Sequence, residues 1–144
     1  MEYFAAHELV CPHVFKKHGE NSLMFADERL LLWLTWFRDT IKRPVLVNNY
    51  GTTQGDFTQR GYRCNLCHLV SDKTSAGILY ASAHTRFQAV DFNVDDMNDE
   101  EVRQFIERHK KEMPVKIRIE KNTIGWCHVD VATDSFEMIT YFNA

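Results

Sequence analysis

This chain of 144 residues is poor in cysteine and has no excess of positive charge. Four cysteines are too few for a disulfide-stapled scaffold, and we expect them to be reduced thiols. The 17 basic and 20 acidic side chains leave a formal charge of −3 at pH 7, which gives no electrostatic reason to expect nucleic acid as a partner. These absences disfavour a disulfide-rich fold and a polyanionic ligand.

Long apolar runs, repeats and linkers are also missing. No stretch approaches the roughly 18 apolar residues that a membrane span needs. The first residues, Met1 to Phe4, do not begin a basic segment followed by an apolar core, so we expect a protein made in the cytoplasm without a signal peptide. We expect one domain over residues 1–144, and a monomer.

Apolar spacing and capping residues predict two main helices. Over residues 27–41, apolar side chains recur at the spacing of one buried helical face, Asp27 is a suitable N-cap and Pro44 ends the helix. Asn98 and Glu101 form a capping-box-like start for a second helix over 99–113, which Pro114 ends. Both patterns are typical of structural helices.

Short β-rich runs predict a small, mainly antiparallel sheet. The runs lie at 45–47, 90–94, 115–120, 126–133 and 136–142, and the third and fourth form a hairpin. Residues 51–82 include few apolar side chains and are predicted to be mostly irregular surface. We therefore predict an α+β fold in which the helices near 27–42 and 99–113 pack on one face of the sheet.

Three residues of types that commonly ligate metals occur in two short motifs. Ser82-Ala83-His84 precedes Ala89-Val90-Asp91, and Trp126-Cys127-His128-Val129-Asp130 follows later. His84, Asp91 and His128 would supply two imidazole nitrogens and one carboxylate oxygen, which leaves the fourth position of a tetrahedral Zn²⁺ open for water. The pattern predicts a hydrolytic zinc site with these three ligands.

The predicted hairpin also places a carboxylate near this site. Residues two apart on a strand share a face, so Trp126, His128 and Asp130 are expected to point the same way. With the turn centred near Thr123, Glu120 lies opposite Trp126 and diagonal to His128 on that face. A base at Glu120 could then reach a metal-bound water.

These motifs resemble those of the superfamily of zinc D-alanyl-D-alanine carboxypeptidases, phage endolysin peptidases and hedgehog signalling domains, and most closely the phage-type peptidases. The likeness extends through 7–10, the helix before Pro44, 45–50 and Arg60-Gly61-Tyr62-Arg63. It implies zinc held by His84, Asp91 and His128, and hydrolysis of amide bonds in peptidoglycan stem peptides or other D-amino-acid peptides. Such an enzyme acts at the cell wall if it is exported or released by phage lysis.

Two arginines and a serine are the candidate substrate-binding residues. The segment ending at Arg63 resembles the family's Gly-Tyr-Arg, whose arginine helps to hold the substrate. Arg63 and Arg60 could each pair with a substrate carboxylate, and solvated loop arginines are the alternative. Ser82 could orient His84 or the substrate, or could simply form a turn.

The sequence departs from the family in two places. Phe87 stands where the first motif usually has glycine, and a positive φ there would be strained. Relatives place a general base shortly before the last histidine ligand, where this chain has no carboxylate. Glu120 is the nearest one upstream and the candidate base, and Asp130 could be a base or a partner of the ligands. The alternative function is a non-catalytic metal-binding or recognition domain of the same fold.

Cys64 and Cys67 form a Cys-x-x-Cys pair, which can bind zinc or exchange disulfides. A structural zinc site would need a second pair, and only Cys11 and Cys127 remain, at other spacings. A redox role lacks the surrounding strand-to-helix pattern of thioredoxins. The sequence therefore favours partly buried loop cysteines.

Overall fold

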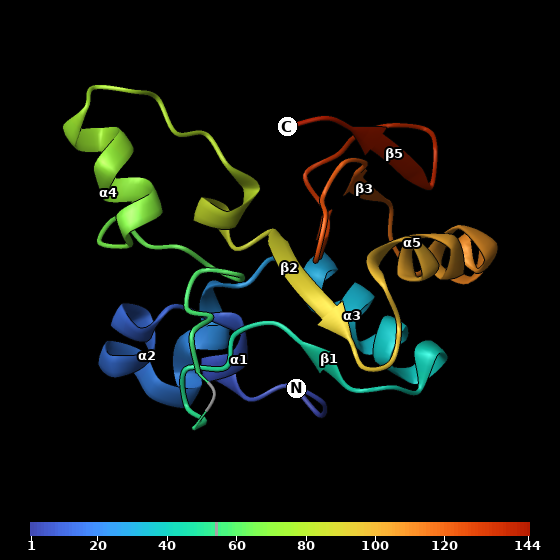
Figure 1. The fold of residues 1–144 in the computed structure, drawn as a ribbon, viewed down its shortest axis with the longest axis horizontal. Coiled ribbons are helices and arrows are strands. Elements are labelled where there is room, and N and C mark those ends of the chain that lie inside the picture. The colour runs from blue at the N-terminus through green and yellow to red at the C-terminus, as the bar shows by residue number, and fades with distance from the viewer. Residues whose placement is uncertain (54) are drawn as a thin grey trace.

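The computed structural model describes residues 1–53 and 55–144, which form a sheet flanked by α-helices and by 3₁₀ helices, labelled η (Figure 1). In chain order the elements are α1 (Ala6–Leu9), α2 (Pro12–His18), η1 (Gly19–Phe25), α3 (Glu28–Ile41), β1 (Val45–Leu46), α4 (His68–Ser75), η2 (Ala83–Arg86), β2 (Ala89–Val94), α5 (Asp99–Arg108), η3 (Lys110–Glu112), β3 (Ile117–Glu120), β4 (Cys127–Asp130) and β5 (Ile139–Phe142). In this view α1 and α2 lie together at one side of the molecule and α5 at the other (Figure 1). Among the described residues, no helix has both the length and the apolar content that a membrane span requires.

The five strands form one mixed sheet in the order β1-β2-β4-β3-β5. The β1–β2, β2–β4 and β3–β4 pairs are antiparallel, and β3–β5 is parallel. The α+β class is confirmed. The last strand is parallel to β3 because the connection over 131–138 passes β3 and enters the sheet at its far edge.

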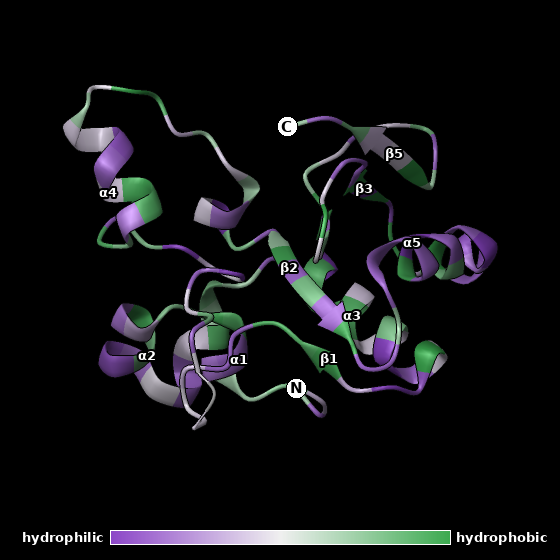
Figure 2. Cartoon of the chain, viewed as in Figure 1, coloured by the Kyte–Doolittle hydropathy of each residue, from purple (hydrophilic) through white to green (hydrophobic). Residues whose placement is uncertain are grey.

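The two faces of the sheet differ in chemistry because side chains alternate along each strand. One face carries the buried apolar residues Val90, Phe92, Ile117, Ile119 and Val129. Phe92 packs against α3, with ring centroids 6.1 Å from Trp33 and 5.4 Å from Phe37, and Phe37 also meets Phe105 of α5 at 6.3 Å. Helices α3 and α5 thus cover this face, as predicted, and Figure 2 shows the alternation of apolar and polar residues along β2. The polar side chains point to the other face.

Helix α3 follows the predicted bounds. The Asp27 carboxylate accepts a hydrogen bond from the backbone N–H of Arg29 at the N-terminus, at 3.0 Å. The helix ends at Ile41, where Lys42 takes a left-handed conformation at φ 55°, two residues before Pro44. Local sequence therefore sets both ends of the longest helix.

Helix α5 is shorter than predicted. It begins as expected at Asn98, whose side chain accepts from the Glu101 N–H at 2.8 Å. It ends at Arg108, however, and only η3 continues toward residue 113. His109 leaves the helical conformation at φ −104° and ψ 9°, and its Nδ1 forms a hydrogen bond with the Phe105 carbonyl at 2.9 Å.

The prediction of irregular structure over 51–82 is wrong for α4. This helix buries only Val70, so its apolar face is too narrow to show in the sequence pattern. The remainder of that segment, within the described residues, is turns and extended chain with a single parallel bridge between Val10 and Tyr62.

The predicted hairpin register is also wrong, by two residues. Arg118 pairs with Asp130 and Ile119 with Val129, so continuing the register places Glu120 opposite His128 rather than opposite Trp126. Trp126 belongs to the turn because its carbonyl accepts a hydrogen bond from Thr123 Oγ1 at 2.6 Å. A shift of two preserves the face on which each side chain lies, so Glu120 still points to the polar face.

Candidate metal centre

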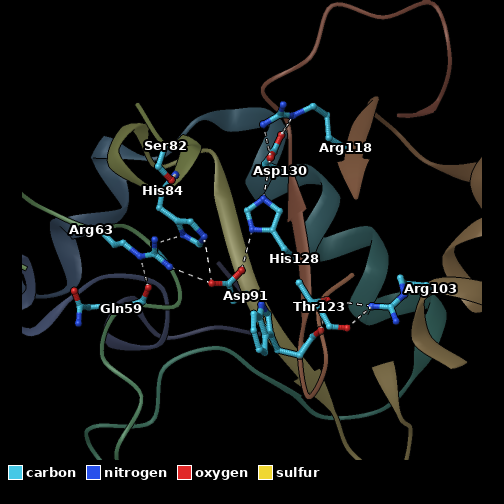
Figure 3. Close-up of polar contacts among 12 residues, drawn as sticks. Gln59, Arg63, Ser82, His84, Asp91, Arg103, Arg118, Thr123, His128 and Asp130 are labelled. Carbon is cyan, nitrogen blue, oxygen red and sulfur yellow. Dashed lines mark hydrogen bonds and ion pairs between the residues drawn. The ribbon is translucent and has the colours of Figure 1, made fainter. Parts of the chain in front are cut away.

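The structure brings His84, Asp91 and His128 together on the polar face of the sheet (Figure 3). Asp91 on β2 pairs directly with His128 on β4, and His84 comes from η2. Asp91 Oδ1 lies 2.8 Å from His128 Nδ1, and Asp91 Oδ2 lies 3.3 Å from His84 Nε2. One ligand atom from each residue lies within 4.8 Å of the others, so the group could hold a metal ion.

A backbone carbonyl sets the orientation of His84. Its Nδ1 is 2.8 Å from the Gly61 carbonyl oxygen, to which it donates, and this leaves Nε2 facing Asp91. Such a contact is the usual way in which proteins fix a metal-binding imidazole. Gly61 is required there because a Cβ would lie 2.1 Å from the Leu9 carbonyl oxygen. Ser82 caps η2 by accepting from the His84 N–H at 3.2 Å, which fits its turn-forming role.

His128 is oriented by a second carboxylate. Its Nε2 lies 2.9 Å from Asp130 Oδ2, so Nδ1 faces Asp91. Asp130 is fully buried, accepts two hydrogen bonds from Arg118 at 2.8 and 2.9 Å, and accepts a third from the Ala132 N–H. Because its oxygens are all engaged, this geometry favours Asp130 as a partner of the ligand rather than as a base.

Burial and neighbouring charge act in opposite directions on the three candidate ligands. Burial lowers the pKa of His84, which favours a neutral imidazole. Burial alone would raise the pKa of Asp91, but hydrogen bonds from His128 and His84 hold it well below its usual range. Burial would lower the pKa of His128, but Asp130 and Asp91 raise it to about 9. The Asp91 carboxylate is therefore ionised, and His84, which is neutral and donates from Nδ1, presents the lone pair of Nε2 to the site.

Contacts hold Arg63 beside these residues. It donates from Nε to the Gln59 carbonyl at 2.6 Å, to the Tyr80 hydroxyl, and to Asp91 Oδ2 at 3.2 Å. Gln59 and Tyr80 were not among the predicted site residues, since no spacing in the sequence links them to the ligands. Their contacts direct the guanidinium toward the metal centre.

Arg60 lies further along the same loop. It donates to Asn93 Oδ1 at 2.7 Å, and its guanidinium lies 4.3 Å from the centre of the Phe57 ring. One of its terminal nitrogens, Nη1, is buried and has no hydrogen-bond partner among the described residues. The backbone carbonyl of Arg60 accepts from the Asp91 N–H at 2.7 Å, which fixes the loop to β2.

A cavity of about 390 Å³ opens above the three candidate ligands. Its lining includes Glu120, Arg63 and Trp126. A second cavity, of about 350 Å³, shares Arg63, Trp126 and Asp91 with the first and extends toward Arg60. Because the two cavities share these lining residues, they adjoin, and together they are called the cleft. A larger cavity of about 510 Å³ beside α5 contains none of the candidate ligands.

Phe87 has a positive φ, the conformation that the resemblance implies for this position. It lies at φ 53° and ψ 46°, which costs a residue with a side chain about 1–2 kcal/mol. Its ring is fully buried and stacks on Tyr62, with centroids 5.1 Å apart and planes within 3°. The turn thus keeps the shape that delivers His84 to the site.

No protein-family model, curated protein or solved structure matches this chain. The functional argument therefore depends on the geometry of its own residues.

Proposed function

We propose that this chain is a zinc-dependent peptidase that hydrolyses amide bonds in bacterial cell-wall peptides, of the D-alanyl-D-alanine carboxypeptidase or endolysin type. The observation that carries the proposal is the donor set of His84, Asp91 and His128 at the base of an open cavity. Two imidazoles and one carboxylate form a known ligand set of hydrolytic zinc enzymes, which keep a fourth position for water. The resemblance of the two motifs to wall peptidases supplies the substrate class.

The side chains around the cavity fit the steps of amide hydrolysis. A zinc ion held there would lower the pKa of a bound water toward about 7 and polarise the scissile carbonyl. Glu120 lines the cavity, and no residue in the described part of the chain donates a hydrogen bond to its carboxylate or forms an ion pair with it. It is therefore free to accept the proton of the attacking water and to deliver it to the leaving amine.

The arginines of the cleft fit a substrate that ends in a carboxylate. Arg63 uses three of its five N–H donors on Gln59, Tyr80 and Asp91, which leaves donors for a ligand. Arg60 lines the continuation of the cleft, and Trp126, which is 39% exposed, offers an apolar wall. A peptide with a free C-terminus could thus be held with its last amide bond near the metal.

The test is digestion of purified muropeptides by the zinc-loaded protein, followed by liquid chromatography and mass spectrometry. We expect release of D-alanine or cleavage of cross-links by the wild type, and none by His84→Ala. His18→Ala changes a histidine outside the site and should retain full activity. Zinc-loaded wild type that cleaves no muropeptide would overturn the peptidase proposal and favour a recognition domain. Full activity in His84→Ala would show that other residues catalyse.

A further inference from the structure

A second group of metal-binding side chains forms where the N-terminal helices meet the loop before α4. Cys11 precedes α2, His13 lies in its first turn, and Cys64 and Cys67 come from the loop. One ligand atom from each lies within 4.8 Å of the other three. The sequence analysis did not predict this group because it required a second Cys-x-x-Cys pair. In the structure, one cysteine and one histidine complete the set instead.

The spacing of these atoms matches the edges of a zinc tetrahedron. With Zn–S near 2.3 Å and Zn–N near 2.0–2.1 Å, the edges are about 3.8 Å between sulfurs and about 3.6 Å between sulfur and nitrogen. Cys64 Sγ lies 4.0 Å from Cys67 Sγ, and His13 Nδ1 lies 3.6 Å and 3.9 Å from these two sulfurs. Cys11 belongs to the group because its Sγ lies within 4.8 Å of the ligand atoms of the other three residues.

We propose that Cys11, His13, Cys64 and Cys67 bind a structural zinc ion. Three thiolates and one imidazole fill all four tetrahedral positions, so the protein leaves no place for water or substrate. A redox pair would need only Cys64 and Cys67, and it would not account for the convergence of the other two side chains on the same point. Cys127, the remaining cysteine, is buried elsewhere and donates to the Asp99 carbonyl.

The ion would fasten the loop that orients the proposed catalytic centre. The loop is already joined to the N-terminal segment by the Cys11 N–H to Tyr62 carbonyl bond at 3.1 Å and the Tyr62 N–H to Leu9 carbonyl bond at 2.8 Å. Gly61 and Arg63 flank Tyr62, and they contact His84 and Asp91 respectively. An ion bound by Cys64 and Cys67 would hold this stretch of the loop immediately after Arg63.

Cobalt(II) substitution tests the site, because only thiolate ligands give an intense near-ultraviolet charge-transfer band. The full-length protein is stripped of metal, reloaded and desalted, and zinc per chain is measured in parallel samples. We expect two zinc ions and the cobalt band in the wild type, and one zinc and an unchanged band in His84→Ala. The Cys64→Ser/Cys67→Ser variant should keep one zinc and lose the band, while Cys127→Ser should match the wild type.

The outcomes separate this site from the proposed catalytic centre. The structural site would be overturned if the wild type lacked the cobalt band, or if it contained a Cys64–Cys67 disulfide after preparation under reducing conditions. Neither result would affect the proposal of a zinc site at His84, Asp91 and His128. If the serine variant does not fold, His13→Ala provides a second test. The His13 side chain is exposed, so its removal leaves no cavity in the core. His13→Ala should bind the second zinc at least tenfold more weakly in chelator competition. His18→Ala, on the same helix, is its control, and equal affinity of the two variants would overturn the proposal.

Discussion

The two groups of metal-binding side chains differ in how many donors they offer and in what lies above them. The His84 group offers three donors at the base of a cleft, on strands β2 and β4 and the adjoining η2. The Cys64 group offers four donors at the junction of α2 with a loop. Three protein donors below a cleft are typical of a catalytic metal ion, and four protein donors are typical of a structural one.

The groups also differ in how their donors are supported. Each histidine of the first group has a fixed partner behind it, the Gly61 carbonyl for His84 and Asp130 for His128. The second group brings together parts of the chain that are far apart in sequence, since His13 and Cys64 are 51 residues apart. The first arrangement fixes the orientation of the two imidazoles. The second would fix the loop around Cys64 against the N-terminal helices.

Stepwise removal of metal should cause loss of activity and loss of thermal stability in two separate stages. The three-donor ion should leave first and take activity to background, while the melting temperature changes by only a few degrees. Loss of the second should lower the melting temperature by about 10–15 °C, because closing a loop of about 50 residues contributes about 4 kcal/mol. Graded chelation with an indicator, followed by activity assays and calorimetry, measures both stages.

The Cys64→Ser/Cys67→Ser variant is the control for this experiment, since it should show only the first stage. If activity and stability of the wild type fell together with a single equivalent of zinc, the division of roles between the two groups would be wrong.

Glu120→Gln should separate chemistry from metal binding at the first group. The amide cannot accept the proton of the attacking water, so turnover should fall by about 10²–10⁴-fold while two zinc ions remain bound. Steady-state kinetics on a muropeptide and zinc analysis measure the two quantities. Glu112→Gln, an exposed glutamate on η3, is the matched control. Wild-type turnover in Glu120→Gln would exclude it as the base.

Local features of the fold were predictable, and the contacts between distant segments were not. The caps at Asp27 and Asn98 depend on neighbouring residues, and both are confirmed. Alternation on the strands placed the side chains of His128 and Glu120 on the same face, although the register was wrong by two. That register depends on the buried Thr123, which accepts a hydrogen bond from Arg103 of α5, a contact between residues 20 apart in sequence.

The candidate site shows the same division. Ligand types and motif spacing pointed to His84, Asp91 and His128, which the structure brings together. The groups that orient the site residues could not be predicted in the same way. The Gly61 carbonyl and the Tyr80 hydroxyl reach the site only because of the path that the loop takes. The approach of His13 to the Cys-x-x-Cys pair likewise results from packing between α2 and the loop, which no local pattern encodes.

Asp130→Asn should weaken metal binding at the first group without affecting the second. Loss of the carboxylate behind His128 lowers the basicity of the ligand, and such changes typically reduce metal affinity by about 10–100-fold. Chelator competition measures the affinity, and the thiolate–cobalt band of the same sample reports the second group. Asp134→Asn, an exposed position nearby, is the control. Unchanged affinity at the first group would show that Asp130 serves only its pair with Arg118.

Asp27→Asn should give the smallest effect, one that depends on neither metal group. The side-chain hydrogen bond from Arg29 lowers the pKa of Asp27 from 3.8 to about 2, with a smaller contribution from Gln88. The folded protein therefore binds this proton less readily than the unfolded chain. The stabilisation is present above pH 4 and is lost as the pH falls toward 2. Because Arg29 is half-exposed, solvent screening limits it to about 1 kcal/mol.

Asparagine is a good N-cap but does not titrate, so the variant isolates the charge. Between pH 5 and pH 2, the wild type should lose about 1 kcal/mol more unfolding free energy than Asp27→Asn in urea titrations. Any release of metal in acid affects both proteins alike and cancels in the difference. Zinc content at pH 7 should stay at two per chain in the variant, because Asp27 lies outside both groups. Identical pH dependence in the two proteins would show that the Arg29 pair does not stabilise the fold.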